Sequence, residues 1–231
     1  MRDHERAYQG RDRGAARRGG RAGPRQLLIA LAAALAACAS GLHTAPLASQ
    51  QIHPEDLPPT GFGTLKVDDI ALLFSTQDVR VRVLPLDERV IRLLAPDSYE
   101  SFSGLKRLKA AEVDAAARGF GITDPTPLLI TFFGLKERAP FTPEEITLQS
   151  RGRFFRPFAF VPMSPRWGER QVDLRESVVA IALFEPGIAL FDDQLVVSYG
   201  NVNTSAWSTI ARVLDRERSA VLSRAAAAGK Q

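Results

Sequence analysis

The longest apolar run of the chain, residues 27–37, ends directly before its only cysteine, Cys38. This run is shorter than the roughly 20 residues that a helix needs to cross a bilayer. An arginine-rich segment precedes it, and a proline-rich segment, residues 39–63, follows it. Neither flank shows the apolar periodicity of a packed helix or strand. The folded domain therefore has to lie beyond residue 63.

The same run has the features of an export signal. A basic segment, a short apolar stretch and small residues at its end form the secretory pattern, and excess positive charge keeps the first side cytoplasmic. The residues Leu35-Ala36-Ala37-Cys38 resemble the lipobox of bacterial lipoprotein precursors. The resemblance implies that residues 1–37 are a cleaved signal peptide and that lipid on Cys38 attaches the protein to a membrane. Inner-membrane retention signals of such lipoproteins place Asp where this chain has Ala39, so the resemblance favours the periplasmic face of the outer membrane over the inner membrane.

Two alternatives for the long leader stay open. The pair Arg17-Arg18 invites comparison with twin-arginine export signals, although glycine and arginine follow where that signal has apolar residues and lysine. The start codon could also be assigned too far upstream. A later start would then have to be a codon other than Met, since the only other methionine is Met163.

Removal of residues 1–37 changes the charge of the protein. The chain has 30 basic and 26 acidic residues, and loss of the leader's 8 arginines and 3 acids leaves 22 and 23. The remaining chain is nearly neutral, so the basic balance belongs to the leader. Nucleic-acid binding would require a basic patch on the folded domain, and we therefore exclude nucleic acid as a partner.

The distribution of histidine and cysteine limits the possible chemistry. The three histidines are His4, His43 and His53, all before residue 64. The domain therefore lacks the residues of Ser-His-Asp or Cys-His catalysis and the usual zinc ligands, and it has no cysteine for a disulfide. Carboxylate chemistry, as in glycoside hydrolysis, or an oxygen-liganded calcium site would remain possible. We find no phosphate-binding or dinucleotide motif and expect no cofactor.

The remaining chain divides into three parts. Residues 38–63 predict a flexible tether, because proline and small polar residues bury little surface. Residues 64–224 predict a single β-rich domain, and residues 225–231, which lose the apolar pattern, predict a frayed tail.

Short strands dominate the domain. Val79 to Val83 alternates strictly, which predicts a half-buried strand, and we expect Val90 to Leu94 to pair with it across a turn at Pro85 to Glu88. Arg80 and Arg82, with Arg92, would then share an exposed face. This face is a candidate surface for a partner or an anionic ligand, and the alternative is a solvated face neutralised by nearby acids.

A second block of strands follows. Ser177 to Phe184 is apolar on both faces, which is typical of a central strand covered on both sides. Four other segments also predict strands, namely Leu128 to Phe133, Ile146 to Gln149, Phe154 to Val161 and Leu195 to Tyr199. Short strands separated by proline and glycine favour an antiparallel β-sandwich-like domain.

Two helices are expected in addition. The first lies within residues 97–118, with Ser103 as its N-cap and Gly119 as its stop. The second begins after Thr204 or Ser205, and its apolar face contains Trp207, Ile210, Leu214 and Val221. Its polar face is expected to contain Arg212, Asp215, Arg216, Glu217 and Arg218. The predicted fold is thus mainly β with helices, with an inserted helix and a C-terminal helix packed on the sandwich.

Trp167 lies in a loop-like segment between Arg166 and Gly168. As an exposed residue it could stack on a sugar ring or a partner. The alternative is that it plugs one end of the sandwich.

These features favour a non-enzymatic lipoprotein that binds or scaffolds another envelope component, a protein or a glycan. A carboxylate-dependent envelope glycan hydrolase is the first alternative and would show two facing carboxylates in a cleft. A carrier of an apolar ligand is the second and would show an apolar cavity between sheet and helices.

Overall fold

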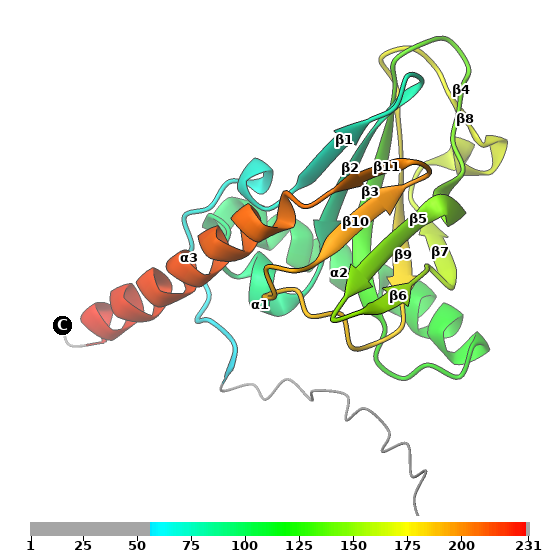
Figure 1. Ribbon diagram of the computed structural model, residues 1–231. Helices are drawn as coiled ribbons and strands as arrows, with labels where there is room; N and C mark the ends of the chain where they lie inside the picture. Colours follow the sequence, from blue (N-terminus) through cyan, green and yellow to red (C-terminus); the bar gives the residue numbers. More distant parts are fainter. Residues whose placement is uncertain (1–55, 230–231) are drawn as a thin grey trace, which may run out of the picture. The chain divides into compact units, whose positions relative to one another are not determined.

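The computed structural model describes residues 56–229 of the 231-residue chain. Every strand pairing is antiparallel, which confirms the predicted mainly β fold with helices (Figure 1). A five-stranded sheet has the order β1-β2-β3-β9-β7, and its strands are β1 (Leu72–Ser75), β2 (Val79–Pro85), β3 (Thr126–Gly134), β9 (Ser177–Phe184) and β7 (Ala159–Pro162). A four-stranded sheet has the order β11-β10-β5-β6, from β11 (Val202–Thr204), β10 (Val196–Tyr199), β5 (Ile146–Ser150) and β6 (Arg153–Phe155). A small third sheet pairs β4 (Ala139–Pro140) with β8 (Gln171–Val172).

The apolar faces of the two larger sheets form the core. Val79, Val81 and Val83 of β2 are buried, as their alternation predicts, whereas Arg80 is exposed. Aromatic rings connect the layers, and the ring of Phe132 lies 5.4 Å from the ring of Tyr199. Ser177 to Phe184 forms a strand between β3 and β7 and is almost continuously buried from Val178 onward. The prediction of a central strand is therefore confirmed.

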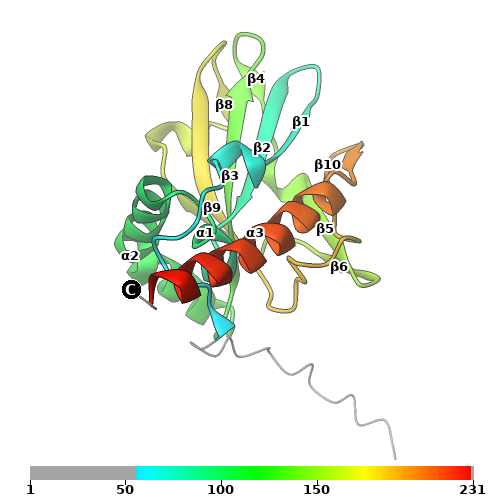
Figure 2. The same ribbon diagram turned by 90° about the vertical axis from the view of Figure 1, so that its left-hand side faces the viewer.

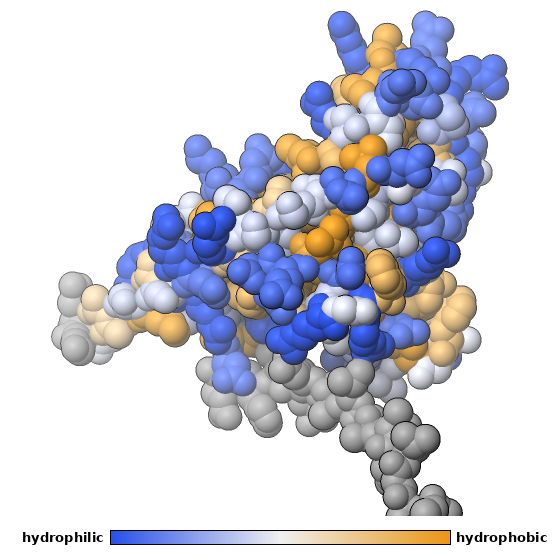
Figure 3. All heavy atoms as spheres, viewed as in Figure 1, coloured by the Kyte–Doolittle hydropathy of each residue, from blue (hydrophilic) through white to orange (hydrophobic). Residues whose placement is uncertain are grey.

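Helices close the remaining sides. The α-helices are α1 (Glu88–Ile91), α2 (Pro96–Gly119) and α3 (Trp207–Ala228), and the short 3-10 helices are η2 (Val67–Asp69), η3 (Pro143–Glu145) and η4 (Pro165–Glu169). α2 packs against β7. α3 buries Trp207, Ile210, Leu214 and Val221, the four residues of its predicted apolar face. Figure 2 shows the outer halves of the long strands extending beyond both long helices, and Figure 3 shows mixed hydrophilic and apolar residues on the surface of one side.

The predicted strand at Val90 to Leu94 is wrong. The backbone forms α1 there, because the Asp87 carboxylate accepts a hydrogen bond from the Arg89 amide and caps the helix. β2 instead pairs with β1 and β3. Arg92 bonds to Glu88, at 3.1 Å, and does not join the face of Arg80 and Arg82.

Three other expectations need correction. α2 begins at Pro96, so Ser103 lies inside the helix and is not its cap. Phe154 to Val161 is not one strand, because β6 and β7 belong to different sheets. Glu217 is not on the polar face of α3, since it is buried beside Leu214 and Val221.

The last residues of the predicted tether lie against the domain. Arg92 and Arg218 donate to the carbonyls of Pro58 and Asp56, at 3.2 Å each. Gly63 packs so closely that an added Cβ would lie 2.3 Å from the Leu94 carbonyl oxygen. Residues 56–63 are therefore part of the folded unit. At the other end α3 continues to Ala228, beyond the point where its apolar pattern stops.

The predicted signal peptide, residues 1–37, Cys38 and the predicted tether up to residue 55 lie outside the described residues. Within residues 56–229, no helix is both long enough and apolar enough to cross a membrane.

Candidate functional site

The structure keeps two of the predicted surface residues, Arg80 and Arg82, on one face and places the third, Trp167, in the core. Arg80 is exposed on the five-stranded sheet, and Arg82 lies on the same face two residues further along β2. Arg82 is neutralised by Asp68 of the neighbouring η2, with Nη2 2.6 Å from the carboxylate. For Arg82 the structure matches the alternative of a face neutralised by nearby acids. Arg80 forms no salt bridge with another residue of the described range.

Trp167 is buried, with 4% of its surface exposed, so its prediction as a surface residue is wrong. Its ring lies 5.3 Å from Phe141, 5.7 Å from Phe160 and 6.0 Å from Phe132. The short helix η4 turns the indole inward. Burial of this apolar ring stabilises the folded state. The burial of Trp167 matches the alternative that it packs as a plug.

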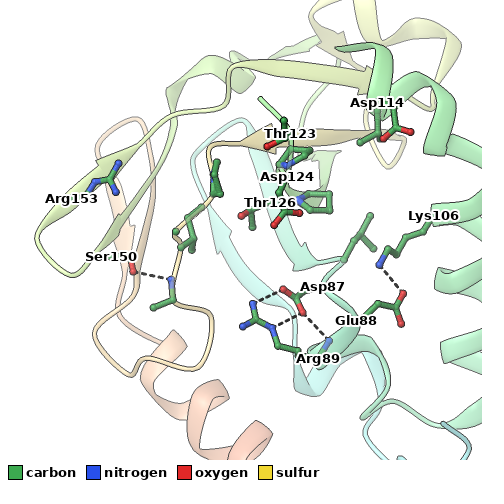
Figure 4. Close-up of a pocket in the computed structure, with 18 of the residues that line it drawn as sticks. Asp87, Glu88, Arg89, Lys106, Asp114, Thr123, Asp124, Thr126, Ser150 and Arg153 are labelled. Carbon is green, nitrogen blue, oxygen red and sulfur yellow. Dashed lines mark hydrogen bonds and ion pairs between the residues drawn. The ribbon is translucent and has the colours of Figure 1, made fainter. Parts of the chain in front are cut away.

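A cleft of about 630 Å³ brings together charged side chains from distant parts of the chain. Its volume is typical of a small-ligand site. Its walls consist of residues 86–89 at the start of α1, residues 123–127 before and at the start of β3, and residues 186–189 after β9, with Lys106, Val113 and Asp114 of α2 and Ser150, Arg151 and Arg153 of the β5–β6 turn. Figure 4 shows Lys106 and Asp114 on one side, Arg153 on the opposite side, and Thr123, Asp124 and Thr126 between them.

Antiparallel pairing explains why these segments meet. Thr126 pairs with Phe184, so the residues that precede β3 and those that follow β9 lie at the same end of these two neighbouring strands. The β5–β6 turn reaches this end through Ser150, whose hydroxyl accepts a hydrogen bond from the Ala189 amide, at 3.2 Å. The cleft is therefore a product of sheet topology.

One wall of the cleft is held by an ion pair. Asp87 accepts from Arg89 Nη2 at 2.7 Å and from Nε at 3.0 Å, in addition to capping α1. The bond to Asp87 raises the pKa of Arg89, burial lowers it by a smaller amount, and the nearby charge of Asp124 raises it further. The two hydrogen bonds hold the side chains of Asp87 and Arg89 in one orientation.

A second ion pair joins α1 to α2. Glu88 accepts from Lys106 at 2.7 Å and from Arg92 at 3.1 Å. Partial burial by itself would raise the pKa of Glu88, but the bonds from Lys106 and Arg92 outweigh it and hold this pKa below its ordinary value. A general acid in glycan hydrolysis needs a raised pKa. Glu88 does not fit that role, so it gives the hydrolase alternative no support.

The polar walls also distinguish this cleft from the apolar cavity that a carrier of an apolar ligand would have. Charged or hydroxyl side chains occur in each of the segments that line it except residues 186–189. Among residues 56–229, no group of three or more His, Cys, Asp or Glu side chains is arranged to hold a metal ion.

Searches with this chain against protein-family models, curated proteins and solved structures found no match.

The sequence reasoning missed every residue of the cleft. Individually they look like turn and surface residues, and they are spread over about a hundred positions of the chain. One signal was present: Thr123 to Thr126 precedes one strong strand, and Glu185-Pro186-Gly187 follows another. If those strands are antiparallel neighbours, the two turns must lie at the same end of the strand pair.

Proposed function

We propose that this protein is a lipid-anchored lipoprotein of the bacterial envelope whose domain binds another envelope component in the cleft between α1, α2 and the β5–β6 turn. The anchor is Cys38, and the compartment is the periplasmic face of the outer membrane. Residues 56–63 connect the anchor segment to the side of α3.

The observation that carries the binding role is a cleft whose walls are held by ion pairs and whose other charged residues, Asp114, Asp124 and Arg153, are exposed. Asp87 and Arg89 hold each other, as do Glu88 and Lys106, before any ligand arrives. Preorganised polar groups bind with less loss of conformational entropy than mobile ones. Binding without catalysis agrees with the lowered pKa of Glu88 and with the absence of histidine and cysteine from the sequence after residue 53.

Site-specific photo-crosslinking in intact cells tests this function. A photoreactive amino acid at Thr123, an exposed residue of the cleft wall, should form discrete adducts with an envelope component. The matched control is the same amino acid at Thr209, an exposed threonine of α3 outside the cleft. Mass spectrometry of the adducts identifies the attached molecule.

The proposal expects adducts from position 123 and none of the same mass from position 209. If position 123 yields no adduct, or if both positions yield the same products, the cleft is not the binding site and the proposed function is wrong.

A further inference from the structure

We infer that the ligand of the cleft is a short peptide segment with a carboxylate towards one end and an ammonium group towards the other. This inference rests on the proposed function, because it names the ligand class of the same site. It follows from which charges in the cleft already have partners and which do not.

The lining residues contain four acids and four bases. Asp87 pairs with Arg89 and Glu88 with Lys106, each at 2.7 Å. Arg151 pairs with Asp192 outside the lining, at 3.2 Å. These five side chains of the cleft are neutralised within the protein and set its shape.

Three charged side chains of the lining belong to exposed residues and have no close ion pair, although the charge of Asp124 also acts on Arg89. Asp114 and Asp124 form no salt bridge with another residue of the described range. The Nη2 atom of Arg153 is 3.9 Å from Glu185, at the outer limit of an ion pair, and 46% of the Arg153 side chain is exposed. Its guanidinium lies over the ring of Phe155, 4.9 Å from the centroid, which supports it from one side. Arg153 can therefore accept a second carboxylate.

The remaining charges are on opposite sides of the cleft. Figure 4 shows Arg153 on one side, Asp114 on the other and Asp124 between them. An extended ligand would place its carboxylate at Arg153 and its ammonium group at Asp124 and Asp114. Thr123 and Thr126 also line the cleft, and their hydroxyls could bond to peptide groups.

A neutral saccharide fits less well. It would cover the exposed side chains of Arg153 and Asp124 without supplying opposite charge, and removing charged groups from water costs free energy. In addition, the described residues that line the cleft include no aromatic ring on which a sugar could stack. The charge pattern therefore favours a peptide.

Calorimetric titration of the purified full chain in detergent tests the ligand class. The probes are alanine peptides of about two to five residues with free ends, which are about 7 to 17 Å long when extended. We expect the affinity to peak at one length, since both ends must reach their partners. Acetylation of the amino end or amidation of the carboxyl end of that peptide should weaken binding about tenfold, the effect of one charge-assisted bond.

Variants assign each end to its residue. The double variant Asp114→Asn/Asp124→Asn should bind the acetylated and the free peptide equally, and Arg153→Gln should bind the amidated and the free peptide equally. The matched controls are Asp215→Asn on α3 and Arg80→Gln on β2, both exposed and outside the cleft, and both should keep the full effect of blocking the ends.

Other results overturn the inference. These are no binding by any free peptide at millimolar concentration, equal binding of blocked and free peptides by the wild-type chain, or tighter binding of a neutral trisaccharide. If crosslinking at position 123 still gives adducts, only the ligand class is wrong. If crosslinking also fails, the proposed function falls with it.

Discussion

At the scale of single residues, Glu217 connects the N-terminal segment to α3. Its Oε1 atom accepts hydrogen bonds of 2.9 Å from the Thr64 amide, the Thr64 hydroxyl and Arg224 Nη2. Arg224 also donates to the Phe62 carbonyl. The residue is only 8% exposed, so these bonds replace the water that a surface carboxylate would have. These contacts hold Phe62 and Thr64 against α3.

Replacement of Glu217 tests the contact. Burial alone would raise the pKa of Glu217, but the bonds from Arg224 and Thr64 lower it below 4.5. The stabilisation is therefore fully present above pH 4.5 and is lost as the pH falls through the lowered pKa of the folded state. We expect Glu217→Gln to reduce the free energy of unfolding by about 2 kcal/mol at pH 7, because charged hydrogen bonds are lost.

Urea unfolding of the wild-type protein and of the Glu217→Gln variant, between pH 7 and pH 3, measures the effect. The difference between them should shrink below pH 4.5. Glu100→Gln, at an exposed position of α2, is the control and should change stability by less than about 0.5 kcal/mol. A difference that stays constant down to pH 3 would contradict the role of the Glu217 charge.

At the scale of elements, the residues at which α1 and α2 begin could not be predicted from sequence patterns. Ser103 has the residue type of a cap, yet α2 begins at Pro96, because proline fits the first turn of a helix. Asp87 is the cap that the pattern missed. The segment after it is apolar enough to look like a strand, but in the structure Asp87 accepts a hydrogen bond from the Arg89 amide and caps a helix there.

A pair of alanine substitutions tests these two assignments. Asp87→Ala should cost about 1 to 2 kcal/mol, since it removes a true N-cap and its ion pair. Ser103→Ala should change stability by no more than about 0.5 kcal/mol, because alanine is the better residue inside a helix. Thermal unfolding measures both. A loss at Ser103 as large as that at Asp87 would show that α2 begins near Ser103.

At the scale of the whole molecule, the strands with a clear burial pattern were predictable, whereas their assembly was not. Val79 to Val83 and Ser177 to Phe184 follow the two patterns that a strand can have, half-buried and fully buried. The position of Trp167 could not be chosen from its neighbours in sequence, because its partners Phe132, Phe141 and Phe160 come from other elements. The cleft depends in the same way on the pairing of β3 with β9.

The proposed role as a whole combines a tethering point with a binding domain. The tether between Cys38 and Asp56 is at most about 60 Å long when extended. The cleft would therefore act within a thin layer next to the membrane. Cys38 is the residue on which this arrangement depends.

The most direct measurement is the mass of the mature N-terminal peptide of the protein extracted from the membranes of producing cells. The account predicts that this peptide begins at Cys38 and carries lipid, and that a Cys38→Ala variant is not processed at this position and incorporates no labelled fatty acid. Protein that still begins at Met1 with an unmodified Cys38, or unchanged lipid incorporation by the variant, would contradict it.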